Sequence, residues 1–223
     1  MQATFPHRLL RQVSKFWPEG MSQEPQDSIN GTPTIVPTMR GRWMASCQFV
    51  LHGEAATLEW QAFLAQMEGQ IGTTLVPAHY RFRPLDRDGH PLSFCDVANI
   101  AGAQTWTHFG FANTDIIRAA VAADAPLRAT QIDLKYYNTT GLRPGQYFSI
   151  GDRLHRVQAA WKPDSLTDRI IFQPPLRRAV GTNAIVEIEK PVCRMRMTTE
   201  TEGVFDQSLD VLPSVTVNFQ EAL

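Results

Sequence analysis

The segment 141–157 constrains the fold of this chain more than any other part of the sequence. An alternating run over 146–150 is bracketed by glycines, and a Gly-Asp pair, which is a strong tight-turn signal, leads directly into a second short run. The segment therefore predicts a β-hairpin and contains nothing that resembles a catalytic motif. We expect its turns and strands to depend on Gly141, Gly145, Tyr147, Ile150, Gly151, Asp152, Leu154 and Val157.

The hairpin belongs to a longer series of short extended segments separated by breakers. Apolar runs at 170–172 and 185–189 are divided by Pro174 and Pro175, and Pro191 ends the series. This grouping predicts a small β-barrel-like module over residues 127–191.

A strand followed by a helix is predicted earlier in the chain. Residues 43–51 alternate with period two, and residues 54–71 show apolar spacings of three and four that indicate an amphipathic helix ending at Gly69. Residues 73–77 then resume extended structure. The apolar stripe of the helix consists of Ala56, Trp60, Phe63, Leu64, Met67 and Ile71. We expect Trp60, Phe63, Leu64 and Met67 to form part of the core.

The two ends of the chain are expected to share one domain. Residues 192–198 and 214–220 alternate again, so the sequence predicts a β domain made of 1–126 and 192–223, interrupted by the module 127–191. The first forty residues contain many breakers and fit either an arm that packs on a partner or a terminus wrapped on its own domain. Residues 90–125 show little pattern, although 114–123 fit a short capped helix or a helical turn.

Composition excludes several classes of protein. The net charge of −1 provides no field that would attract a polyanion, which disfavours nucleic-acid binding. No apolar run is long enough to span a bilayer, the start of the chain lacks a signal-peptide core, and we expect synthesis in a cytoplasm.

Reactive and metal-binding chemistry is also not predicted. Cys47, Cys95 and Cys193 are far apart and odd in number, which favours buried thiols over disulfides. The histidines are scattered along the chain, and none lies near a cysteine at the spacing that zinc ligands have. Neither a metal nor another cofactor is therefore expected. Asp152 and His155 would lie on opposite faces of a strand, which argues against a catalytic dyad.

Three parts of the sequence resemble tailed-bacteriophage tail-tip proteins. They are Gly53-Glu54-Ala55 with Trp60-x-x-Phe63-Leu64-x-x-Met67-x-Gly69, the block from Tyr147 to Val157, and the closing Val-x-Phe-x-Glu-Ala-Leu. The chain is most similar to the distal tail proteins of siphophages. This resemblance implies a tail-tube-like β-sandwich with one helix, which forms a ring of six copies between the tail tube and the tip or baseplate hub. It also implies a second β domain that projects outward.

The expected function is therefore structural: a ring-forming adaptor in the virion rather than an enzyme. We expect subunit contacts from the strand 43–51, the loop 72–90 and the N-terminal arm. The candidate interface residues are Trp43, Ala45, Cys47, Phe49, Leu51, Thr73, Leu75 and Phe82. The alternative is a receptor- or carbohydrate-binding module that uses aromatic residues of the insert for stacking. Its candidate residues are Tyr136, Tyr137, Tyr147 and Trp161. A cell-wall hydrolase is a third and weaker hypothesis.

Overall fold

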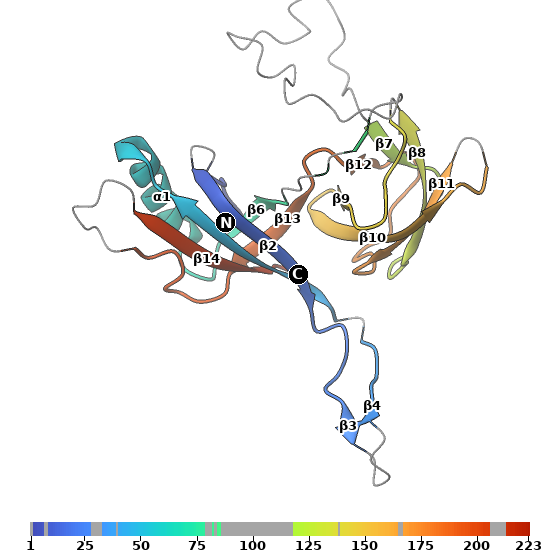
Figure 1. Cartoon of the computed structure of the whole chain (residues 1–223), viewed down its shortest axis with the longest axis horizontal. Coiled ribbons are helices and arrows are strands. Elements are labelled where there is room, and N and C mark those ends of the chain that lie inside the picture. The colour runs from blue at the N-terminus through green and yellow to red at the C-terminus, as the bar shows by residue number, and fades with distance from the viewer. Residues whose placement is uncertain are drawn as a thin grey trace, which may run out of the picture. The chain divides into compact units, whose positions relative to one another are not determined.

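The chain folds into two units (Figure 1). The computed structural model describes residues 2–6, 9–27, 33–38, 40–78, 82, 84–85, 118–137, 139–164, 167–205 and 213–223. The first unit, here called the sheet unit, contains residues 1–79, 152–154 and 192–223. The second, here called the barrel unit, contains residues 80–151 and 155–191.

The sheet unit is built on one six-stranded mixed sheet. In spatial order its strands are β1 (Gln2–Ala3), β6 (Thr73–Pro77), β13 (Val192–Met197), β14 (Ser214–Glu221), β5 (Arg42–Val50) and β2 (Leu10–Glu19). The pair β1–β6 is parallel and the other pairs are antiparallel. The predicted strands at 43–51, 73–77, 192–198 and 214–220 are therefore confirmed.

One face of this sheet is covered by the helix α1 (Gly53–Met67). Trp60, Phe63 and Met67 are buried, and the ring centroids of Trp60 and Phe49 lie 5.6 Å apart. The prediction of this helix and of these core residues is confirmed, while Leu64 is half-buried. Ile71 is wrong as a core residue, because the left-handed backbone at Glu68 and Gly69 ends the helix and leaves Ile71 73% exposed.

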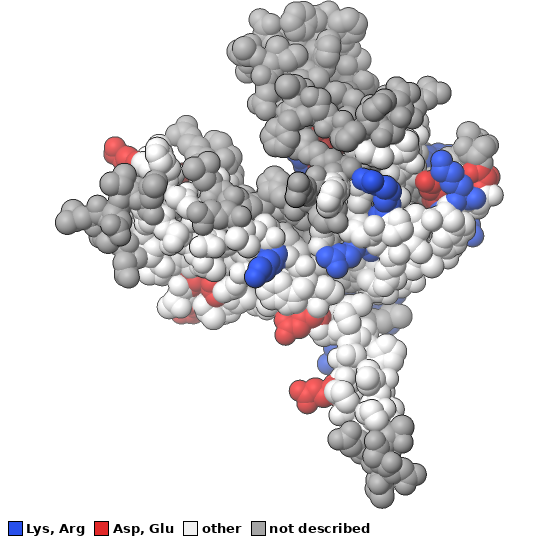
Figure 2. Space-filling model, in the orientation of Figure 1, with Lys and Arg blue, Asp and Glu red and all other residues white. Residues whose placement is uncertain are grey.

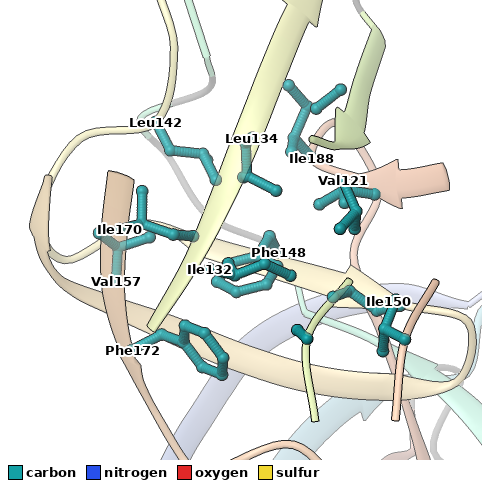
Figure 3. Close-up of a cluster of buried hydrophobic side chains, with 14 of the residues drawn as sticks. Val121, Ile132, Leu134, Leu142, Phe148, Ile150, Val157, Ile170, Phe172 and Ile188 are labelled. Atoms are coloured by element: carbon teal, nitrogen blue, oxygen red, sulfur yellow. The ribbon is translucent and has the colours of Figure 1, made fainter. Parts of the chain in front are cut away.

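The barrel unit is a closed six-stranded barrel. Its strands are β7 (Arg118–Val121), β8 (Gln131–Tyr137), β9 (Tyr147–Ile150), β10 (Arg153–Trp161), β11 (Asp168–Gln173) and β12 (Ile185–Glu187), in the spatial order β10-β11-β8-β7-β12-β9. Inward-facing aliphatic side chains pack around Phe148 and Phe172 (Figure 3). The prediction of a mainly β protein with one helix and a barrel-like module is confirmed.

The barrel begins earlier than residue 127, where the inserted module was expected to start. β7 pairs with both β8 and β12, so residues 118–121 are needed to close the barrel. The expected capped helix or helical turn over 114–123 is wrong from Arg118 onward, where the chain forms β7, and its first residues lie outside the described part of the chain. In the sheet unit, the described residues form one six-stranded sheet with α1 against it and a separate two-stranded ribbon, in place of the two packed sheets of a sandwich.

The strand 43–51 was wrongly expected to be an edge that meets other subunits. β5 pairs with β14 on one side and β2 on the other, and the side chains expected at the interface are each at most 1% exposed. These side chains, which form part of the core beneath α1, are Trp43, Ala45, Cys47, Phe49 and Leu51. An alternating apolar pattern indicates that one face of a strand is buried. It does not indicate whether other strands pair with the two edges of that strand.

β2 is the actual edge strand, and the sequence analysis missed it. A register shift between Arg11 and Val13 breaks the alternation, and Pro18 adds a second interruption. Of the other expected interface residues, Thr73 and Leu75 are half-buried on β6, which has partners on both sides, and Phe82 is exposed. Most of the loop 79–90 lies outside the described residues.

Candidate interaction surfaces

A two-stranded arm, residues 20–38, continues β2 and returns to β5. Its strands β3 (Gln26–Asp27) and β4 (Pro33–Thr34) pair antiparallel, and a further bridge joins Ser22 to Pro37. Backbone hydrogen bonds hold its base, from Gln23 N to Val36 O at 2.9 Å and from Thr38 N to Met21 O at 2.8 Å. The irregular N-terminal region of the sequence therefore contains an ordered ribbon, which Figure 1 shows running beyond the end of the sheet.

The arm buries almost nothing in its own chain. Residues 22–26 and 33–37 are exposed along both strands, including Ile35 at 60% and Val36 at 46%. The described part of the arm carries few charged side chains (Figure 2). An isolated two-stranded ribbon is marginally stable in water, because it has no apolar face to bury. An exposed ribbon with aliphatic side chains is therefore suited to packing on another surface.

The edge strand β2 adds a second exposed feature beside the arm. Within the described part of the chain β5 is its only ladder partner, so its other side is an open edge. Val13 and Trp17 lie on the face of β2 away from α1 and are 39% and 40% exposed. Open edges and exposed aromatic residues are both common at protein interfaces.

A polar cluster within the sheet unit holds the three residues 152–154. The Asp152 carboxylate lies 2.7 Å from Nε of Arg194, and the Leu154 carbonyl accepts a 2.7 Å hydrogen bond from the Trp43 indole. The buried Glu221 carboxylate accepts hydrogen bonds from Trp43 N at 3.0 Å and from Arg153 Nη1 at 3.3 Å. These contacts link four segments that are far apart in sequence, so no local pattern in the sequence indicates them.

The hairpin residues chosen from the sequence have structural positions. Gly141, Gly145 and Gly151 all have positive φ, and Ile150 and Val157 are buried in the barrel. Leu154 is buried in the sheet unit, and Asp152 belongs there too. His155 packs against Phe148 and Phe172, and its Nδ1 lies 2.7 Å from the Pro174 carbonyl oxygen. The contacts of the two side chains differ: Asp152 pairs with Arg194, whereas His155 contacts Phe148, Phe172 and Pro174.

The stacking candidates on the barrel divide into buried and exposed residues. Tyr147 is buried, and its hydroxyl accepts a hydrogen bond from Arg156. Tyr136 is half-buried, and burial raises the pKa of its hydroxyl. Tyr137 and Trp161 remain exposed, so they are the two candidates with an accessible ring.

Trp161 begins a row of three outward-facing side chains across neighbouring strands. It pairs with Arg169 on β11, which pairs with Asp133 on β8. Two hydrogen bonds join the guanidinium and the carboxylate, from Nε to Oδ1 at 2.7 Å and from Nη2 to Oδ2 at 2.8 Å. The hydrogen bonds from Arg169 lower the pKa of Asp133, which keeps this carboxylate ionised near neutral pH.

Other kinds of site receive no support from the described residues. Among them, no group of three or more His, Cys, Asp and Glu side chains is placed to hold a metal ion. In the same part of the chain, no helix is long and apolar enough to cross a membrane. Cys47 and Cys193 are buried free thiols, and burial raises the pKa of Cys193. Cys95 lies outside the described residues.

Comparison with known proteins adds no relative. No protein-family model matches the chain, and no curated protein sequence matches it. The exposed surfaces described above are therefore the structural basis for proposing a function.

Proposed function

We propose that this protein is a structural component of a phage tail, where copies of it form a ring that joins the tail tube to the tip or baseplate hub. The observation that supports this best is the combination of the open β2 edge with the arm that continues it. Both come from the same segment, and both expose apolar side chains.

A ring requires a different surface toward each of two neighbours, so that rotation rather than a two-fold axis closes the assembly. The sheet unit has such an asymmetry, because its strand order begins with the two-residue β1 and ends with the ten-residue β2. One strand of the arm, the eight residues from Gly20 to Asp27, extends roughly 25 Å, which is enough to reach well onto an adjacent subunit. The place in the tail comes from the sequence resemblance alone.

The experiment is native mass spectrometry of the purified full chain, with negative-stain imaging of the same sample. We expect ring particles at several times the 25.1 kDa mass of one chain. The double variant Ile35→Ser/Val36→Ser should lower the ring population at least tenfold, because it removes the apolar contacts of the arm. A matched control is Leu58→Ser/Ile71→Ser, which changes two equally aliphatic exposed residues near α1 and should leave the rings intact.

Two results would contradict the proposal. One is a wild-type chain that remains monomeric at high concentration, both alone and with tail-tube and hub proteins of the same phage. The other is immunogold labelling of intact virions that finds the chain away from the distal end of the tail.

A further inference from the structure

The outer surface of the barrel unit offers an inference that goes beyond assembly. We propose that the row formed by Trp161, Arg169 and Asp133 binds a saccharide, with the indole as a stacking platform and the ion pair as the hydrogen-bonding group.

The first argument concerns Trp161, which occupies the last position of β10 and is 43% exposed. The indole makes no hydrogen bond or ring contact with the described residues, and the barrel core is complete without it. The indole therefore presents a flat apolar surface that the barrel core does not use, and the C–H faces of a pyranose ring are suited to such a platform.

The second argument concerns the ion pair beside the indole. Arg169 pairs directly with Trp161 across the strands, so their Cβ atoms lie about 5 Å apart on the same face. The doubly hydrogen-bonded geometry holds the guanidinium and the carboxylate in one orientation. Each carboxylate oxygen keeps a further lone pair, and Nη1 keeps its N–H groups, so the pair presents acceptors and donors together.

The third argument concerns the kind of ligand. The row spans two strand intervals, or about 10 Å, which suits one or two sugar rings rather than a polymer of bases. Because Arg169 and Asp133 neutralise each other, the row favours a neutral hydroxylated ligand over a phosphate or a carboxylate. Alternating donors and acceptors next to an aromatic ring match the hydroxyl groups and apolar face of a sugar.

The experiment is a printed array of bacterial cell-surface glycans, read with the fluorescently labelled full chain. We expect the wild type to bind a limited set of related glycans, and Trp161→Ala to weaken that binding at least tenfold. Ile185→Ala is the control, because Ile185 is also exposed, at 59%, on the barrel strand β12 but lies outside the row. It should bind like the wild type.

Two further variants separate a binding role from a folding role. Trp161→Phe keeps an aromatic platform and should retain most of the affinity, whereas Arg169→Lys keeps the charge, loses the two-point geometry and should weaken binding several-fold. Thermal melting of each variant reports whether the barrel is intact.

The proposal is overturned if the wild type binds no glycan, or if Trp161→Ala and Ile185→Ala behave alike. It is also overturned if Trp161→Ala impairs only co-assembly with tail proteins, since the indole would then be a protein contact. Ring formation is measured separately, so either proposal can fail without the other.

Discussion

The two units use similar strands but manage their edges in opposite ways. The barrel closes on itself, so the backbone of every barrel strand finds a neighbour within the unit. The sheet unit leaves β2 at one end and a very short β1 at the other, and it extends β2 into an exposed arm. An open edge is an aggregation hazard unless something covers it, whereas a closed barrel needs no partner for its backbone. This difference is the reason that we propose assembly through the sheet unit and ligand binding on the outer surface of the barrel.

The largest change in the free energy of unfolding is expected for a core substitution in the sheet unit, which tests whether the two units are stabilised by separate hydrophobic cores. Trp60→Ala should lower the free energy of unfolding of the sheet unit by about 3–5 kcal/mol, because a fully buried indole is lost. Native-state hydrogen exchange should show reduced protection in β5 and β14 but little change in β8 and β11. Trp60→Phe is the control, since it loses mainly the hydrogen bond to the Gly203 carbonyl. Equal loss of protection in both units would refute the idea of separate cores.

Comparing alanine substitutions at Gly141 and Gly145 tests how tightly the barrel unit is packed around these glycines. Gly141→Ala should destabilise the protein by about 3 kcal/mol, from positive φ combined with overpacking. A Cβ added there would lie 2.7 Å from Asp168 Oδ2 and 3.0 Å from Tyr136 Cε2. Gly145→Ala has the same backbone problem, but no atom lies within 4 Å of the added Cβ, so it should cost about 1 kcal/mol. Urea denaturation measures both, and similar values would mean that the Gly141 site is not crowded.

The next largest change in the free energy of unfolding is expected at Glu221, the buried carboxylate of the sheet unit. Arg153→Ala should cost about 2 kcal/mol, because the Glu221 carboxylate loses its ion pair and hydrogen bond with Arg153. In a double-mutant cycle, adding Glu221→Gln to Arg153→Ala should cost less than the same change in the wild type. Strict additivity of the two changes would show that the contact contributes nothing.

The smallest effect concerns the pKa of Asp168 at the start of β11. Burial raises this pKa, so the folded state disfavours the charged carboxylate and loses stability as the pH rises above the ordinary aspartate value of about 4. Asp168→Asn should therefore raise the melting temperature slightly at pH 7, and the gain should shrink toward pH 3. A lower melting temperature for Asp168→Asn at pH 7 would mean that the charged form makes a favourable contact.

Local pattern was enough to predict most of the strands and the helix. The alternation at β5 and β14 and the three-and-four spacing of α1 directly reflect which side chains are buried. The same reasoning failed for β2, where a bulge and Pro18 hide the alternation, and for β7, where only four residues form the strand. Short or irregular strands carry too few positions for a period to be recognised.

The candidate surfaces were less predictable than the fold. Trp161 was identified as an exposed aromatic residue from its sequence context, but its neighbours Arg169 and Asp133 depend on the pairing of β10, β11 and β8. Four alternating residues of β5 and Leu51, which follows it, were assigned to an interface, although the structure buries them, because a period of two describes a face and not an edge.

The sequence by itself determined the class of fold, the position of the helix, the hairpin at 141–157 and the apolar core positions, since each depends on residues close together in the chain. Tertiary structure alone decided which strands are edges, where the barrel closes, and how Glu221 meets Arg153 and Trp43. These features depend on pairing between segments that are far apart in sequence, where many arrangements satisfy the same local pattern and packing of the whole chain selects one of them.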